Sequence, residues 1–212
     1  MARITFTGIS SGNLGVHVGD DDAHVAANRS ELNKLLSIPK IIFMRQVHGN
    51  EVINVDFDTQ GEPECDAIIS TDKSVGLAVL SADCLPILVS SKVAIAAIHA
   101  GRKGLVNGII PKTINQMIAL GATEIEAIIG PAICGDCYEV DPIMYSEITR
   151  GLPSMVAKNG RSNLDLISGA ISQLQSSNVK SKYVNVCTKQ SNDFYSYRRL
   201  QNTGRQAGVI SF

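Results

Sequence analysis

The chain has 212 residues, of which 44% are hydrophobic and 18% charged, an ordinary mix for a water-soluble globular protein. With 19 basic against 20 acidic residues and no basic cluster, it lacks the charge pattern of a nucleic-acid-binding protein or of a polybasic membrane anchor. No apolar stretch reaches the roughly 18 residues of a membrane span and the start lacks a signal-peptide core, so we expect no membrane contact and a cytoplasmic protein with reduced cysteines.

In the first half of the chain, a turn-rich loop and a helix precede a series of strands. The loop covers residues 10–22, whose last carboxylates suit the start of a helix that Pro39 ends. The predicted apolar face of this helix holds Val25, Leu32, Leu35 and Leu36. Six apolar segments then predict strands at residues 41–44, 51–55, 67–69, 76–80, 85–89 and 93–98. The last segment is almost continuously apolar, which is expected of a strand buried on both faces.

The second half mixes helices with strands. The apolar spacing predicts a helix within residues 105–120, a strand at 125–129, a helix at 164–175 and a strand at 183–187. An arginine-rich tail follows at residues 196–205. Because helices and strands do not alternate strictly, we predict an α+β fold with mixed sheets. The length suits one large domain or two small subdomains that share a core, and we take residues 1–212 as a single domain.

Three residues at the edges of these segments, His48, Cys84 and His99, are candidates for a metal site. A hairpin can bring Cys84 and His99 together, whereas His48 must be delivered by the fold. Two imidazoles and a thiolate suit one zinc ion with a fourth position left open. The alternative without a metal is a small buried cysteine with two hydrogen-bonded histidines. A blue-copper site with Met44 as axial ligand is disfavoured, because the short loop that usually carries its cysteine and one histidine is missing.

Asp83 precedes Cys84 in an otherwise apolar stretch, where a carboxylate needs a partner. One hypothesis is that Asp83 orients a metal ligand or acts as a general acid or base. The other is that it is a turn aspartate bonded to local backbone amides. The residues alone leave both open.

Two further features have several interpretations. Cys134 and Cys137 form a lone C-x-x-C motif, which fits a redox pair or half of a zinc site. Basic residues in glycine-containing or ligand-adjacent segments suit phosphate or carboxylate recognition, although surface charge is the ordinary fate of any one of them. These are Arg45, Arg102, Lys103, Arg198, Arg199 and Arg205.

These motifs resemble the laccase-domain family, also called multicopper polyphenol oxidase or YfiH-like, nearly from end to end. The amino-terminal matches are Asn13-Leu14-Gly15, His17-Val18-Gly19-Asp20 and Val25-Ala26-Ala27-Asn28-Arg29. The central matches are Gln46-Val47-His48-Gly49, Asp66-Ala67, Ala82-Asp83-Cys84-Leu85-Pro86 and His99-Ala100-Gly101. The later matches are Gly130-Pro131-Ala132-Ile133, Cys137-Tyr138-Glu139-Val140, Cys187-Thr188, Ser196-Tyr197-Arg198-Arg199 and Thr203-Gly204-Arg205.

The resemblance implies an α/β/β/α sandwich of two α+β halves, with one Zn²⁺ per chain on His48, Cys84 and His99. It implies purine nucleoside phosphorylase activity on adenosine, inosine and guanosine, with adenosine deaminase and methylthioadenosine phosphorylase activities. Copper is not expected, since by resemblance to true laccases the copper set needs on the order of ten histidines and this chain has four. The chain departs from the family where Arg102-Lys103 replaces Trp-Arg and where Cys134-Gly135-Asp136 replaces a Gly-Pro-small run.

Under this hypothesis the partners are purine nucleosides and phosphate. Arg45 and Lys103 bind phosphate, and Glu139, in its family motif, joins them in binding substrate. Asp83, Cys84 and Arg45 are the expected catalytic residues. One alternative is a cysteine hydrolase, including a cell-wall precursor editing enzyme, with Cys84 as nucleophile and His99 as base. Another is a structural zinc or redox-sensing protein that recruits Cys137. The oligomeric state stays open.

Overall fold

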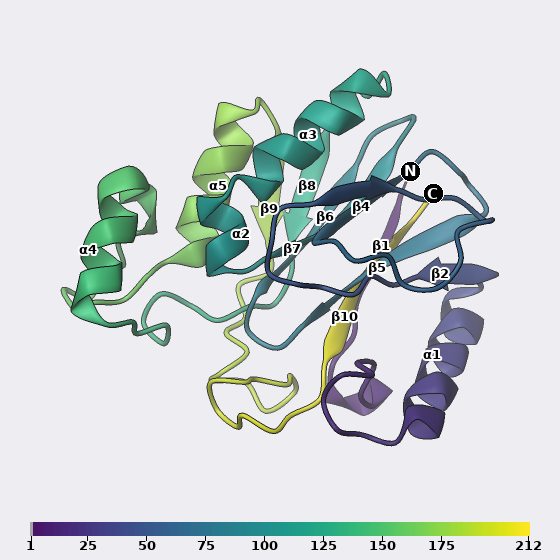
Figure 1. Cartoon of the computed structure of the whole chain (residues 1–212), viewed down its shortest axis with the longest axis horizontal. Helices are drawn as coiled ribbons and strands as arrows, with labels where there is room; N and C mark the ends of the chain where they lie inside the picture. Colours follow the sequence, from purple (N-terminus) through teal and green to yellow (C-terminus); the bar gives the residue numbers. More distant parts are fainter. Residues whose placement is uncertain (1) are drawn as a thin grey trace.

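Two mixed β-sheets, stacked face to face with helices on their outer sides, make up the computed structural model, which describes residues 2–212 (Figure 1). The order of layers is helix, sheet, sheet, helices. This confirms the predicted α+β class and its α/β/β/α arrangement. None of the helices in residues 2–212 is both long and apolar enough to cross a membrane.

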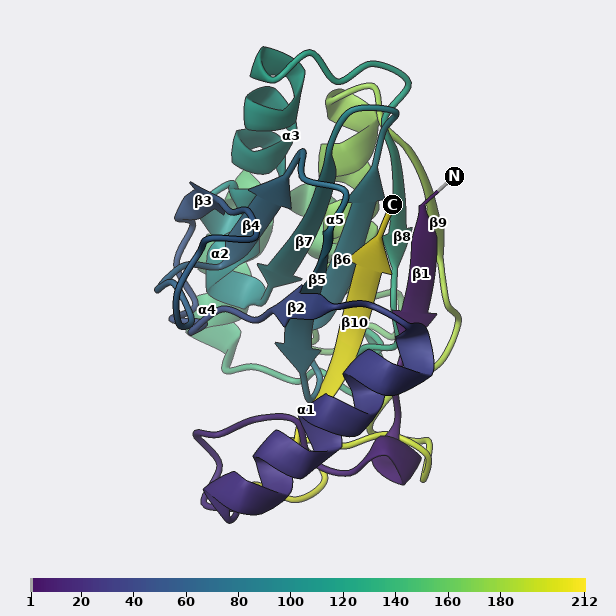
Figure 2. The same ribbon diagram turned by 90° about the vertical axis from the view of Figure 1, so that its right-hand side faces the viewer.

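The smaller sheet has four strands and is covered by one long helix. Its strands, in spatial order, are β1 (Arg3–Phe6), β10 (Gln206–Ser211), β5 (Val75–Ser81) and β2 (Lys40–Ile42). Strand β10 pairs antiparallel with β1 and β5, while β2 runs parallel to β5. Helix α1 (Asp22–Leu36) begins at Asp21, whose carboxylate accepts a hydrogen bond from the amide of Ala23 at 2.7 Å. Figure 2 shows α1 in front of this sheet.

The larger sheet has six strands and positions the candidate site. In spatial order they are β3 (Val52–Asn54), β4 (Ala67–Ser70), β7 (Ile95–Ala100), β6 (Leu85–Ser90), β8 (Glu126–Ile129) and β9 (Lys180–Tyr183). The outer pairs β3–β4 and β8–β9 are parallel, and the inner pairs are antiparallel. The helices on this side are α2 (Arg102–Val106), α3 (Ile109–Ala119), α4 (Pro142–Gly151) and α5 (Leu166–Ser176). Short 3₁₀ turns lie at Ile9–Ser11 and Pro153–Met155.

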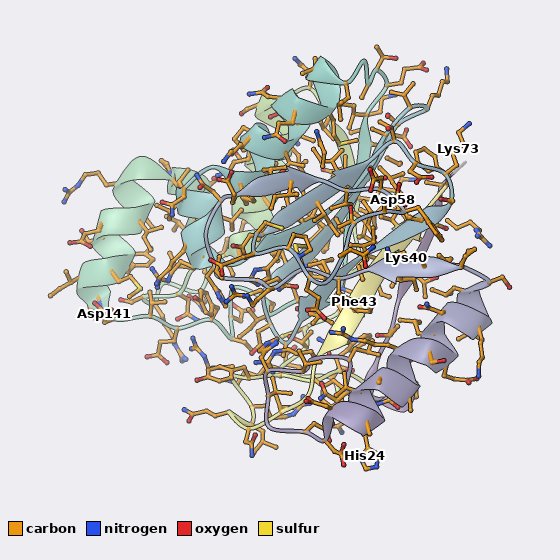
Figure 3. All side chains as sticks on the ribbon, turned by 45° about the vertical axis from the view of Figure 1, so that its right-hand side comes forward. His24, Lys40, Phe43, Asp58, Lys73 and Asp141 are labelled. Atoms are coloured by element: carbon orange, nitrogen blue, oxygen red, sulfur yellow. The ribbon has the colours of Figure 1, made fainter. Side chains whose placement is uncertain are left out.

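Three apolar clusters hold the layers together. The cluster between the sheets includes Leu77, Val79, Leu88, Ala97 and Ile210. A second joins the large sheet to α2, α3 and α5, and a third joins the small sheet to α1. In the third, Phe43 (labelled in Figure 3) is buried, and the guanidinium of Arg29 on α1 lies 3.9 Å from its ring centroid. Each fully buried Leu, Ile or Phe side chain contributes about 1.5–3 kcal/mol to folding.

The structure corrects several predicted elements. The strand predicted at residues 183–187 is wrong: β9 ends at Tyr183, and the chain leaves the sheet there. Leu35 is wrong as a core residue, because its side chain is 74% exposed. The helix predicted within residues 105–120 is confirmed as α3, but a separate short helix, α2, precedes it, since the chain turns at Gly108, whose φ is +75°. Strands β1 and β10 and helix α4 were not predicted.

Candidate metal centre

His48, Cys84 and His99 meet at one end of the large sheet, and their ligand atoms lie within 4.8 Å of one another. His99 stands opposite Pro86 in the β6–β7 hairpin, so Cys84, just before β6, lies beside it. The expected hairpin is therefore confirmed. His48 comes from the loop between β2 and β3, and its ring meets that of His99 edge-on, with centroids 4.8 Å apart.

Asp66 is the residue that joins this loop to the sheet. It lies directly before β4, and its side chain is fully buried. The Nδ1 atom of His99 donates to its Oδ1 at 2.7 Å. The backbone amides of His48 and Gly49 donate to its two oxygens at 3.0 and 2.6 Å. One carboxylate thus orients one candidate ligand directly and fixes the backbone of another.

His48 adopts a backbone conformation that needs such support. Its φ of +59° lies in the left-handed region, which non-glycine residues rarely occupy. The amide of Val47 also points at Asp66, at 3.4 Å, so three successive amides converge on one carboxylate. This convergence offsets the conformational cost of the turn that presents the His48 ring.

The site separates charge between Cys84 and its neighbours. Burial by itself raises the pKa of the Cys84 thiol, but the adjacent His99 and His48 outweigh it and bring that pKa to about 6. Burial lowers the pKa of His99, but the Cys84 sulfur and Asp66 outweigh it and raise that pKa to about 9. For Asp66, burial is opposed by the His99 hydrogen bond and the loop amides, which leave its pKa below the usual value. These shifts favour a Cys84 thiolate beside the imidazole of His99, which the Asp66 carboxylate holds in place.

This donor set fits a zinc-type metal ion. Because Nδ1 of His99 is bonded to Asp66, Nε2 is the ring atom left to face a ligand. Metal-binding histidines commonly donate their second ring nitrogen to a carboxylate in this way. Two imidazoles and one thiolate are ligands that zinc accepts, with a fourth position left for water or substrate.

Gly101 supplies the space beside these ligands. A Cβ atom there would lie 3.0 Å from Sγ of Cys84 and 3.4 Å from Cδ2 of His48. We expect Gly101→Ala to displace both side chains and to weaken zinc affinity roughly tenfold, the lower end of what disturbed ligand support costs. The backbone of Gly101, at φ −78°, suits alanine, so crowding is the cause to be tested. Titration with a chromophoric zinc chelator measures the change.

Gly151→Ala is the matched control for Gly101→Ala. It adds the same methyl group at the end of α4, where a Cβ would meet nothing within 4 Å. Its zinc affinity should equal that of the unaltered chain. Equal affinities for both variants would show that the ligands do not occupy the positions described.

Asp83 does not bond to local amides, as one hypothesis had it. Its φ is +102°, and its carboxylate is buried. Its Oδ1 accepts from the hydroxyl of Thr188 at 2.6 Å, and its Oδ2 accepts from the amide of Arg198 at 2.7 Å. Both partners are more than 100 residues away in sequence. Asp83 therefore ties two C-terminal loops to the residue before Cys84.

Three other predicted site residues, Arg45, Lys103 and Glu139, are exposed. Arg45 is exposed and paired with the carboxylate of Glu64. Lys103 is exposed on α2, at a groove of about 620 Å³ between α2 and α4. Glu139 has an exposed side chain, and its backbone oxygen accepts from Nη1 of Arg198 at 2.8 Å. Within residues 2–212, no hydrogen bond or ion pair joins these three side chains to the metal-ligand candidates.

Three further residues, Tyr138, Arg205 and His17, lie close enough to the centre to interact electrostatically with Cys84 or His48. Burial raises the pKa of Tyr138, while the nearby charge of Arg102 lowers it and that of Cys84 raises it. Burial lowers the pKa of Arg205, and the nearby Cys84 and Asp83 oppose that shift. Burial and then Arg205 lower the pKa of His17. The sequence analysis named Arg205 as a candidate for anion recognition, whereas His17 and Tyr138 appeared only within the family motifs, because the tertiary fold brings them near the centre.

The sequence and the fold are similar to known proteins over nearly their whole length. The profile of a family described as multi-copper polyphenol oxidoreductase laccase matches residues 5–212. A purine nucleoside phosphorylase of Corynebacterium glutamicum is 42% identical, over 95% of this chain and 87% of its own. One from Streptomyces coelicolor is 41% identical, over 93% and 86%. The crystal structure of YlmD from Geobacillus stearothermophilus has a TM-score of 0.86 at 28% identity, covering 100% of this chain and 91% of that one.

Proposed function

The chain belongs to the family described as multi-copper polyphenol oxidoreductase laccase, and from this premise we propose that it is a zinc-dependent purine nucleoside phosphorylase. The relatives in Corynebacterium glutamicum and Streptomyces coelicolor carry that activity in their names. The laccase part of the family description does not extend to this chain, because its four histidines cannot ligate the copper set of a laccase.

The observation that carries the proposal is the convergence of His48, Cys84 and His99, with Asp66 behind them. These three side chains would hold one zinc ion. When bound, zinc supplies a Lewis acid that can polarise an oxygen atom of a substrate or water. His48 is exposed and Cys84 is partly exposed, so the centre is accessible to solvent.

The chain's own residues supply the charge that phosphorolysis needs. In this reaction an oxygen of phosphate bonds to C1′ of the ribose while the bond from C1′ to the purine breaks and the purine takes up a proton. Arg205 lies near Cys84, Arg102 lies against Tyr138, and a guanidinium group can donate two parallel hydrogen bonds to phosphate oxygens. Arg45 and Lys103 remain proposed phosphate ligands, although Arg45 would first have to break its ion pair with Glu64. Glu139 remains a proposed substrate contact.

The roles that we propose for Cys84 and Asp83 are supported by their positions. Cys84 acts as a metal ligand, and Asp83 fixes the loops of Thr188 and Arg198 around it.

The proposed substrates are adenosine, inosine and guanosine. Methylthioadenosine phosphorolysis uses the same bond exchange. In adenosine deamination, water instead bonds to the purine ring carbon that bears the amino group, the bond from that carbon to the amino nitrogen breaks, and ammonia leaves. The proposal places all of residues 1–212 in one domain.

The deciding experiment measures adenine release from adenosine with and without phosphate on one zinc-loaded sample. We expect adenine and ribose 1-phosphate to form only with phosphate, to disappear after chelation and to return with zinc. Inosine formed without phosphate would report the deaminase activity separately. Zinc binding without turnover of any nucleoside would contradict the proposal and favour a structural role.

A cysteine hydrolase is the second candidate, because one observation favours it. Asp66, His99 and Cys84 form a carboxylate–imidazole–thiolate series, and the pKa of Cys84 is about 6. That mechanism requires the thiolate but no metal. Chelation separates the two, since it should leave a cysteine hydrolase active while thiol alkylation inactivates it.

A further inference from the structure

Three cysteines outside the centre described above converge on one point. The Sγ atoms of Cys134, Cys137 and Cys187 all lie within 4.8 Å of one another. Cys134 and Cys137 follow β8, and Cys187 follows β9, so the cluster joins two loops that leave neighbouring parallel strands. All three residues are half-buried. None is among the three side chains of the first centre.

The backbone holds these sulfur atoms together independently of any bond between them. The amide of Cys137 donates to the carbonyl of Cys134 at 3.0 Å, which closes a tight turn around the C-x-x-C motif. The amides of Ala132 and Thr188 bond across the two loops at 3.3 and 3.1 Å, which places Cys187 beside this turn. The convergence is therefore built into the loop geometry.

One of the three sulfur atoms is prepared to carry negative charge. The amide of Cys134 donates to Sγ of Cys187 at 3.4 Å. Although burial opposes it, this amide and those of Lys189 and Gln190 lower the pKa of Cys187. Burial and the two neighbouring cysteines raise the pKa of Cys134 to about 12. Burial also raises the pKa of Cys137, so neither Cys134 nor Cys137 favours the thiolate without a counter-charge. A cation between the three sulfur atoms would supply that counter-charge.

We propose that Cys134, Cys137 and Cys187 form a second metal site, which binds a thiophilic divalent ion such as zinc through three thiolates. Binding releases the thiol protons and leaves a fourth position for water. The ion would link the loop that precedes Tyr138 to the loop of Thr188, whose hydroxyl bonds to Asp83. This site is independent of the nucleoside chemistry proposed above, so either proposal can fail without the other.

The test counts metal in the full-length chain after reconstitution with zinc and removal of excess. We expect about two zinc ions per unaltered chain, one per site. The double variant His48→Ala/His99→Ala should keep about one, and so should Cys134→Ser/Cys137→Ser. With cobalt(II) in place of zinc, sulfur-to-metal charge-transfer absorption should persist in the histidine variant and fall by most of its intensity in the cysteine variant.

A measurement on the unaltered chain covers the case in which a variant does not fold. Zinc should protect Cys134, Cys137 and Cys187 from iodoacetamide, as mapped by mass spectrometry. Equal alkylation of all three with and without zinc, or only one zinc ion in the unaltered chain and in the cysteine variant, would overturn the proposal. Finding two of these cysteines joined as a disulfide in a chain purified under reducing conditions would also overturn it, in favour of a redox pair.

Discussion

Replacing Cys84 with alanine is expected to remove the metal from the first centre and to reduce phosphorolysis to background. The substitution deletes the only anionic ligand of the set. It also removes the sulfur atom that interacts with the imidazoles of both His99 and His48. The loss of zinc affinity should be larger than the roughly 10- to 100-fold loss that follows when the carboxylate partner of a metal ligand is removed. Zinc titration and phosphate-dependent adenine release are the two measurements.

Two comparison variants make this result specific. Cys65→Ala removes another buried thiol, whose pKa burial raises to about 12, and it should leave zinc binding and turnover intact. His48→Ala separates the metal hypothesis from the cysteine hydrolase, in which His99 alone serves as base. The metal hypothesis expects loss of zinc and activity together. Retention of both in Cys84→Ala would rule out this centre as the site of chemistry.

The part of the site that the sequence predicted is the part built by local structure. Leu85-Pro86-Ile87-Leu88-Val89 and the apolar run before His99 form adjacent strands, because continuous apolar segments separated by a short polar turn pair as a hairpin. The position of His48 could not be predicted in this way. It depends on a left-handed turn whose amides are accepted by Asp66, a residue just before β4 and distant in sequence.

The parts of the fold that the sequence missed depend on partners distant in the chain. β10 alternates weakly and lies at the far end of the sequence, yet it forms the centre of the small sheet between β1 and β5. The stretch at 184–187 has strand-like composition, but it leaves the sheet to bring Cys187 beside Cys134. Arg45 shows the same limit for functional residues. It lies three residues before His48 in the sequence, which suggested a role in the site, but its side chain pairs with the carboxylate of Glu64.

Asp66 is not one of the metal-ligand candidates, yet its substitution should change both the stability of the protein and its zinc affinity. Asp66→Asn keeps the shape but replaces one carboxylate oxygen by an NH₂ group. In place of Oδ1 that group would face both the His48 amide and the His99 Nδ1 proton, and in place of Oδ2 it would face the Gly49 amide. Each of these donors needs an acceptor. A buried donor left unpaired costs about 1–3 kcal/mol, so the free energy of unfolding should fall by that amount.

Asp66→Asn should also lower zinc affinity by about 10- to 100-fold, because His99 loses its anionic partner and His48 loses the support of its left-handed turn. The matched control is Asp72→Asn, in the loop marked by Lys73 in Figure 3, at the other end of β4. Asp72 also accepts several hydrogen bonds, from Phe57 and Ser74, but in an exposed turn. Denaturant unfolding and zinc titration of both variants should show a change in zinc affinity for Asp66→Asn alone. If both variants lost stability but neither lost zinc affinity, Asp66 would be a structural residue of the loop and not the positioning group of the centre.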